Sequence, residues 1–138
     1  MRTSKQIKGT LSMLSAAAYF TKQGWIVSIP VDDFGEYDLI IDNNNPLCGK
    51  NNLLKVQVKT AYWDNSKKRY IVSLVTSHIR GKGKRYNKKY NLNSFHRLVA
   101  IEPENGFIYQ WSIDEVAGKR SITVYPNKEY ELNRNTLY

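Results

Sequence analysis

The sequence predicts a mixed α/β or α+β domain in which one N-terminal helix precedes a meander of strands. Near the start of the chain, apolar residues recur at helical spacing, at Ile7, Leu11, Leu14 and Ala18. After Gly24, apolar and polar residues alternate in several short segments, as they do in strands with one buried face. We interpret the 138 residues as one domain, with a core over about residues 4–125 and a polar tail over 126–138.

Local signals define the helix and the first strand. Ser4 is placed to cap the helix, because its hydroxyl can accept a hydrogen bond from an N–H group of the first turn. Gly24 is placed to end the helix in a left-handed conformation. Residues 25–29 then alternate as a strand that Pro30 stops, and residues 32–36 form a turn.

The two following strands carry the most informative residues of the chain. Residues 37–42 and 53–60 both alternate apolar and polar side chains, and a turn-rich segment joins them. If these strands pair, Asp38, Gln57 and Lys59 converge on one patch of the sheet. Such a carboxylate, amide and ammonium group suit phosphodiester hydrolysis, which needs oxygen ligands for a hard divalent cation and a positive charge beside the phosphate.

The second half of the chain predicts further strands. Residues 69–75 form a strand that pairs back through a turn at 64–67, residues 98–102 and 107–113 form a hairpin, and residues 122–125 form a last strand. No interdomain linker or internal repeat separates these elements.

Three segments have weaker patterns. Residues 81–93 show no apolar periodicity, and we expect a loop there that becomes ordered on DNA. A second core helix has one candidate, within residues 91–98. The polar tail from Asn127 onward is expected either to lie partly disordered or to dock on a partner chain.

The charge distribution points to a nucleic-acid partner. The net charge is +9, and no acidic residue occurs between Asn65 and Ile101. A solvated basic face is the alternative interpretation, but contact with a nucleic-acid backbone is the stronger one. Tyr86 and Tyr90 lie among the basic residues, where they either stack on nucleic acid or pack within a strand. The candidate DNA-binding residues are Lys67, Lys68, Arg69, Arg80, Lys82, Lys84, Arg85, Tyr86, Lys88 and Lys89.

Other classes of protein are excluded by composition. No apolar run approaches the ~20 residues of a membrane span. Cys48 is the single cysteine, so the chain forms no internal disulfide, and a reducing cytoplasm is the simplest location for a DNA-associated protein. Cys48, His78 and His96 do not have the spacing of zinc ligands.

The order Asp38, Gln57, Lys59 resembles the pattern of the PD-(D/E)XK nuclease superfamily. That pattern is an aspartate at one strand end, then an acid, any residue and a lysine on the next strand. Residues 4–9 and 23–31 are similar to the opening of the intron-encoded homing endonucleases of this superfamily. Holliday-junction resolvases begin with a similar helix.

The resemblance implies both a fold and an activity. The fold is restriction-endonuclease-like, with the N-terminal helix packed on a mixed sheet. The activity is metal-dependent DNA endonuclease activity, of the site-specific homing type, that hydrolyses phosphodiester bonds with Mg²⁺, for which Mn²⁺ can substitute. The partners implied are double-stranded DNA and further copies of the chain, in a dimer or tetramer.

The resemblance also assigns roles to residues. Asp38 and the carbonyl next to Gln57 hold the metal ion, Gln57 is a further ligand or positions water, and Lys59 stabilises the phosphorane. The family places a glutamate on the first helix where this chain has Met13. Met13 and the neutral Gln57 favour an alternative, a non-catalytic DNA-binding protein with the same fold.

Two further alternatives follow from the same positions. A Holliday junction resolvase would share the chemistry and differ in the shape of its DNA substrate. The charge missing from the first helix would come from the turn before the second strand, where Asp33 and Glu36 are the two candidates.

Overall fold

We describe a computed structural model, which covers residues 1–32, 35–43, 53–80, 84–126 and 134–136. Side chains are described outside 76–87 and 134–136.

Helix α1 (Ser4–Lys22) begins at the residue that was predicted to be its cap. Thr3 is the N-cap, and the expectation for Ser4 is wrong because Ser4 already lies in the first turn. A capping box fixes this end: Gln6 N donates to Thr3 Oγ1 (3.2 Å), and Thr3 N donates to Gln6 Oε1 (2.9 Å). At the other end, the expectation for Gly24 is confirmed by its left-handed φ of 87°.

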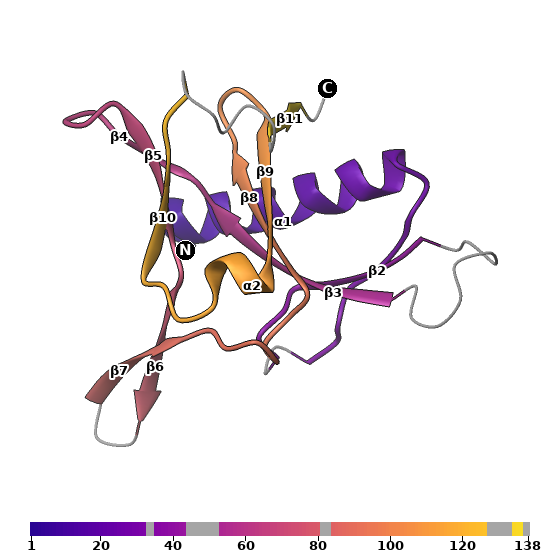
Figure 1. Ribbon diagram of the computed structural model, residues 1–138, viewed down its shortest axis with the longest axis horizontal. Helices are drawn as coiled ribbons and strands as arrows, with labels where there is room; N and C mark the ends of the chain where they lie inside the picture. The colour runs from indigo at the N-terminus through magenta and orange to yellow at the C-terminus, as the bar shows by residue number, and fades with distance from the viewer. Residues whose placement is uncertain (33–34, 44–52, 81–83, 127–133, 137–138) are drawn as a thin grey trace.

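A six-stranded mixed sheet forms the centre of the fold (Figure 1). Strands β3 and β8 pair in parallel, and every other neighbouring pair in this sheet is antiparallel. In spatial order the strands are β1 (Ile26–Ser28), β2 (Leu39–Asp42), β3 (Leu53–Thr60), β8 (Arg97–Glu102), β9 (Phe107–Ser112) and β11 (Arg134–Thr136).

A second sheet and a separate hairpin are built from the middle of the chain. The three-stranded sheet has the order β10 (Ser121–Val124), β5 (Arg69–Ser73) and β4 (Tyr62–Asp64). Strands β6 (Val75–Arg80) and β7 (Lys84–Lys89) pair only with each other and extend away from the rest of the molecule (Figure 1). A short helix, α2 (Ile113–Val116), follows β9.

The structure confirms most predicted strands and corrects three expectations. Residues 84–89 form strand β7, so the loop expected over 81–93 is wrong for this part. The helix expected within residues 91–98 is absent, because the Asn91 side chain accepts from Asn93 N (2.8 Å) and Ser94 N donates to the Asn91 carbonyl (3.0 Å), which makes a turn. The tail contributes β11, which pairs with β9 of its own chain.

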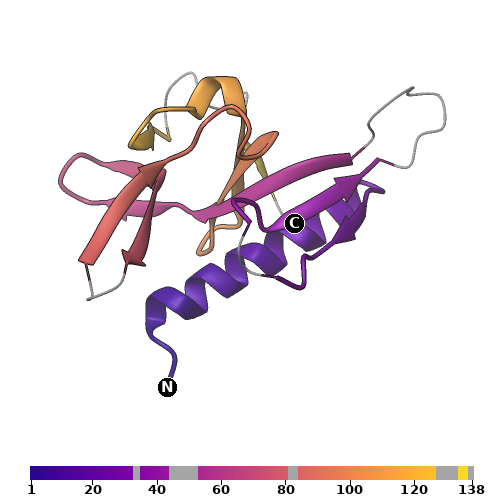
Figure 2. The same ribbon diagram turned by 90° about the horizontal axis from the view of Figure 1, so that it is seen from below.

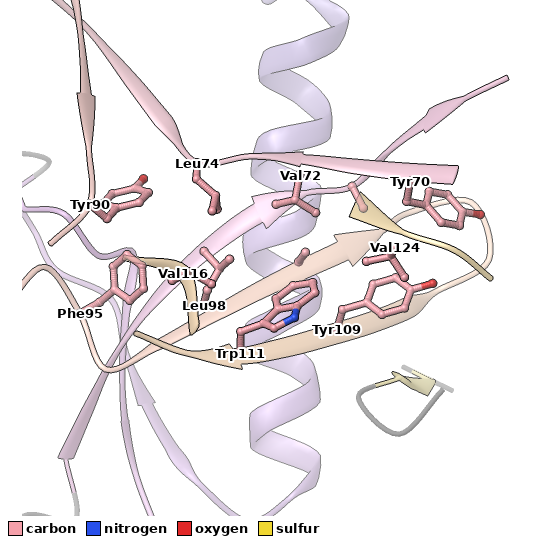
Figure 3. Close-up of a cluster of buried hydrophobic side chains, with 12 residues drawn as sticks. Tyr70, Val72, Leu74, Tyr90, Phe95, Leu98, Tyr109, Trp111, Val116 and Val124 are labelled. Carbon is pink, nitrogen blue, oxygen red and sulfur yellow. The ribbon is translucent and has the colours of Figure 1, made fainter. Parts of the chain in front are cut away.

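Two apolar clusters cover opposite faces of the central sheet. Helix α1 packs on one face, and the three-stranded sheet and α2 cover the other (Figure 2). On the second face, Tyr109, Trp111 and Leu98 lie beneath Val72 of β5 and Leu74, which follows that strand (Figure 3). Strand β3 runs between these layers, so its alternate side chains face two different environments.

One buried polar contact ties α1 to the end of β3. The hydroxyls of Ser12 and Thr60 lie 2.7 Å apart and are both buried. Because each hydroxyl satisfies the other, the contact fixes α1 along the sheet without leaving a buried polar group unpaired. The arrangement expected from the sequence, an N-terminal helix packed on a mixed sheet, is confirmed.

Candidate active site

Asp38 lies at the point where β2 separates from β3. Pairing between the two strands ends at Leu39 and Val56, immediately after Asp38. The backbone N–H of Asp38 donates to the Val56 carbonyl (2.9 Å), and the Asp38 carboxylate accepts from Val58 N through Oδ2 (2.9 Å). The Asp38 side chain thus pairs with a backbone N–H of β3 at a point where β2 no longer does so. This hydrogen bond holds the carboxylate against β3.

Gln57 is hydrogen-bonded to the same carboxylate. Its Nε2 donates to Asp38 Oδ2 (2.9 Å) and to the Val58 carbonyl (3.3 Å). Only 9% of Gln57 is exposed, so these contacts are shielded from water. The amide group therefore bridges two oxygens with its positive end, as a cation placed between them would.

Lys59 completes the predicted trio at a half-buried position. Burial lowers the pKa of its ammonium group, the charge of Asp38 opposes this decrease, and Lys5 reinforces it. The Lys59 Nζ atom lies 5.5 Å from the centre of the Tyr90 ring. The structure therefore brings Asp38, Gln57 and Lys59 to one end of the β2–β3 pair, while their catalytic roles remain predictions.

A hollow of about 440 Å³ opens between this site and α1. Met13 lies on its wall, facing the same space as Asp38 and Gln57. The position at which the resemblance places a helix glutamate therefore lines the same hollow as Asp38. Its full lining is Arg2, Gln6, Gly9, Thr10, Met13, Asp38, Gln57 and Val58.

The oxygens of this site suit a hard divalent cation. Among the described residues, no group of three His, Cys, Asp or Glu side chains is placed to bind a metal. Mg²⁺, however, is commonly held by one or two carboxylates and completed by water and substrate phosphate. The Asp38 carboxylate, the Val58 carbonyl and the Gln57 side-chain oxygen, once the amide rotates, form such a set.

Of the two acidic candidates in the preceding turn, the structure describes Glu36, which does not add to this set. The Glu36 carboxylate pairs with Lys88, whose Nζ lies 2.6 Å from Glu36 Oε1. Asp33 lies outside the described residues. The negative charge in the described part of the site is therefore that of Asp38.

The candidate DNA-binding residues fall into three groups. At the β4–β5 turn, Arg69 contacts Asp64 (3.2 Å) and the Tyr125 hydroxyl (3.4 Å), so its charge is partly offset within the chain. Lys68 donates to Asn65 (2.6 Å). A second group, Lys67, Lys88 and Lys89, is exposed. In the third group, Lys82 lies outside the described residues, and the side chains of Arg80, Lys84, Arg85 and Tyr86 are not described.

Tyr90 is buried and does not lie on the molecular surface. Only 3% of its surface is exposed, and its ring packs edge-on against Phe95 at a centroid distance of 4.9 Å. The expectation that Tyr90 stacks on nucleic acid is therefore wrong, and the strand-packing alternative is correct. Its contact with Lys59 was not predicted, because the two residues are 31 positions apart in the sequence and Tyr90 lies just after β7, which does not pair with β3.

Comparison with known proteins identifies the family. A model of the PD-(D/E)XK endonuclease family matches residues 3–136. The chain belongs to the PD-(D/E)XK endonuclease family. Among solved structures, this family member is similar to a bacterial homing endonuclease, I-Ssp6803I, with a TM-score of 0.78 and 25% sequence identity. The similarity covers 94% of this chain and 83% of that protein.

One further comparison gives no additional relationship, and the helices give no sign of a membrane span. A search of curated protein sequences finds no match for this PD-(D/E)XK endonuclease. Within the described residues, no helix has the length and apolar character needed to cross a membrane.

The burial of Lys59 leads to a prediction about stability. Replacing Lys59 by Met is expected to raise the free energy of unfolding at pH 7 by roughly 1 kcal/mol, because burial is the largest influence on this ammonium and disfavours its charge. This change corresponds to a melting temperature about 4 °C higher. Thermal unfolding in EDTA measures it, with Lys89→Met, at an exposed lysine, as the control.

The same argument fixes a dependence on pH. The unfolded chain binds the Lys59 proton more tightly than the folded chain, so the stability of the wild type rises between the lowered pKa and the ordinary value of 10.5. The difference in free energy of unfolding between wild type and Lys59→Met should therefore disappear as the pH rises through that range. A Lys59→Met protein that is less stable than wild type at pH 7 would show that the attraction to Asp38 outweighs burial.

Proposed function

We propose that the chain is a Mg²⁺-dependent endonuclease that cuts double-stranded DNA at specific sites, as homing-type enzymes do. The observation that carries this proposal is the contact of Gln57 with Asp38, beside the half-buried Lys59, at the point where β2 and β3 separate. The family to which the chain belongs supports nuclease activity on DNA. Mg²⁺, its replacement by Mn²⁺ and site specificity are part of the proposal.

The residues of the site would divide the chemistry among them. Asp38, the Val58 carbonyl and Gln57 would hold the cation, which when bound supplies a Lewis acid for the phosphate and lowers the pKa of a bound water. Lys59 would place its ammonium group beside the attacked phosphate, where negative charge develops. The partial burial of Lys59 strengthens this interaction, because fewer water molecules screen the charge.

We propose that the β6–β7 hairpin binds the phosphate backbone of the DNA. It extends from the body of the molecule (Figure 2), and its sequence carries Arg80, Lys82, Lys84 and Arg85 with no acidic residue. Phosphate contacts of this kind give affinity without reading the sequence. We also propose a homo-oligomer, a dimer or tetramer, because cutting both strands of a duplex requires two active sites. A cytoplasmic location remains a prediction.

A non-catalytic DNA-binding protein is the second candidate function. Two observations favour it: Met13 faces the hollow where the family has a glutamate, and Gln57 is neutral. Each carboxylate removed from a divalent-cation site sacrifices attraction that an amide dipole only partly replaces. The two candidates share a fold and a DNA-binding surface, so an activity assay must separate them.

Restoring the missing charge tests the proposed metal site. The wild type should nick supercoiled plasmid only with millimolar Mg²⁺ or Mn²⁺, and Met13→Glu should lower the metal concentration for half-maximal cleavage by about 10-fold. One additional carboxylate within a few ångströms of a divalent cation is worth at least ~1.4 kcal/mol, which is a factor of ten. Agarose-gel cleavage across a metal titration measures this change.

Three variants serve as controls for that titration. Asp38→Asn and Lys59→Met should abolish cleavage, and Met13→Gln should leave the metal requirement near that of the wild type. A four-way DNA junction beside the plasmid distinguishes a resolvase. Absence of cleavage by both the wild type and Met13→Glu, with DNA binding retained, would establish the non-catalytic alternative.

The salt dependence of DNA binding tests the hairpin. We expect a log–log slope of roughly −4 to −5 on duplex DNA, for about five neutralised phosphates. Replacing Lys82, Lys84 and Arg85 together by Ala should reduce the slope by up to ~2.7 and weaken all sequences about equally. Fluorescence anisotropy at several salt concentrations gives the slope.

A matched pair of single substitutions sharpens the salt measurement. Arg85→Ala should reduce the slope by ~0.9, the value for one phosphate contact. Arg69→Ala should change it less, because Arg69 already contacts Asp64 and Tyr125. Equal effects of the two substitutions would place the β4–β5 turn at the DNA interface to the same extent as the hairpin.

A further inference from the structure

Lys88 at the end of strand β7 and Tyr90 just after it contact the chain on two sides of the candidate active site. Lys88 pairs with Glu36, two residues before Asp38, at 2.6 Å. Tyr90, two residues after Lys88, lies under the Lys59 ammonium at 5.5 Å. One short segment of chain thus reaches the element that carries the carboxylate and the element that carries the lysine.

The Tyr90 ring is held firmly by its surroundings. It belongs to the apolar cluster between the two sheets and packs at 70° against Phe95 (Figure 3). The carbonyl of Tyr90 accepts a hydrogen bond from Gly118 N (2.9 Å), which fixes the backbone as well. A ring with a fixed position offers a defined surface to any group that lies over it.

The Tyr90 hydroxyl is unusual because it makes no hydrogen bond within the described structure, although it is buried. Burial and the nearby charges of Asp38 and Glu36 raise its pKa, so the phenol stays neutral at all working pH values. A buried hydroxyl without a partner destabilises the fold. A phenylalanine would fill the same space without this penalty, which makes Phe the informative substitution.

Lys59 needs such a fixed contact. A lysine side chain has four rotatable bonds and carries a compact charge, so its ammonium position is poorly defined without a partner. The negative face of an aromatic ring attracts a cation, and the attraction is greater where water is excluded. Within the described part of the chain, the ring of Tyr90 supplies this restraint, and the charge of Asp38 acts on the same group.

We propose that Tyr90 is a positioning residue that holds the Lys59 ammonium through its ring, and that Lys88 with Glu36 anchors this segment to the chain just before Asp38. The proposal rests on the proposed function of Lys59 in DNA cleavage. It also gives the β6–β7 hairpin a direct connection to the site, because its last strand leads into both contacts. The ring, and not the hydroxyl, carries the effect.

Three substitutions separate positioning from simple core packing. Tyr90→Phe keeps the ring and removes the hydroxyl, whereas Tyr90→Leu removes the ring. Phe95→Leu makes a similar truncation in the same cluster. If Tyr90→Leu does not fold, Tyr90→Met replaces it, because its flexible side chain fills core space with little strain.

Single-turnover cleavage of plasmid at saturating protein and Mg²⁺ gives the first readout. We expect Tyr90→Leu to slow cleavage about 10-fold with its DNA affinity unchanged, and Tyr90→Phe and Phe95→Leu to stay within about twofold of the wild type, since one well-placed charge contributes at least this factor. Equal rates for Tyr90→Leu and Phe95→Leu would overturn the proposal and leave the proposed function intact.

Proton–carbon NMR of the Lys59 ε-methylene gives a second readout that does not require activity. The ring should shift these protons upfield in the wild type and in Tyr90→Phe, and the shift should disappear in Tyr90→Leu. Lys59→Met assigns the signal. Absence of the shift in the wild type would overturn the proposal on structural grounds. Absence of wild-type cleavage would remove the proposed function and, with it, the role of Tyr90 in the reaction.

Discussion

The hydrogen bond from Val58 N to Asp38 Oδ2 is the contact on which the site depends. It places a carboxylate at the end of the β2–β3 ladder, where a strand N–H would otherwise lack a partner. Gln57 then donates to the same oxygen, so the position of each group is determined by the other. Because the carboxylate is anchored to the backbone, its negative charge lies at a defined place beside Lys59.

The central sheet supplies the two environments that this arrangement requires. Val56 and Val58 face α1 within one apolar cluster, while Lys59 on the other face reaches the ring of Tyr90. Strand β3 lies between β2 and β8, so it is supported on both edges and cannot shift its register without moving every side chain to the opposite face. The lysine is thereby held half-buried. There its charge lowers the stability of the fold, but the interaction of that charge with a phosphate is stronger because less water screens it.

The sequence was sufficient to predict the helix, the central strands and the grouping of Asp38, Gln57 and Lys59, because period-two alternation determines which residues share a face. It was not sufficient for β7, whose residues Lys84–Lys89 are nearly all polar and pair only with β6. The helix expected within residues 91–98 failed because Asn91 forms a local turn that competes with a helix. The contacts of Tyr90 and Lys88 depend on tertiary packing, which local patterns do not contain.

Localised backbone cleavage by Fe²⁺ tests most directly whether Asp38 and Gln57 form a metal site. Fe²⁺ bound in place of Mg²⁺ reduces added hydrogen peroxide to hydroxide and a hydroxyl radical, and ascorbate returns the resulting Fe³⁺ to Fe²⁺. The radicals cut the protein chain beside the metal. We predict cuts next to Asp38 and at the Gln57–Val58 bond, which Mg²⁺ suppresses and Asp38→Asn abolishes. Cuts elsewhere in the chain, or the same cuts in Asp38→Asn, would contradict a metal site built on the β2–β3 split.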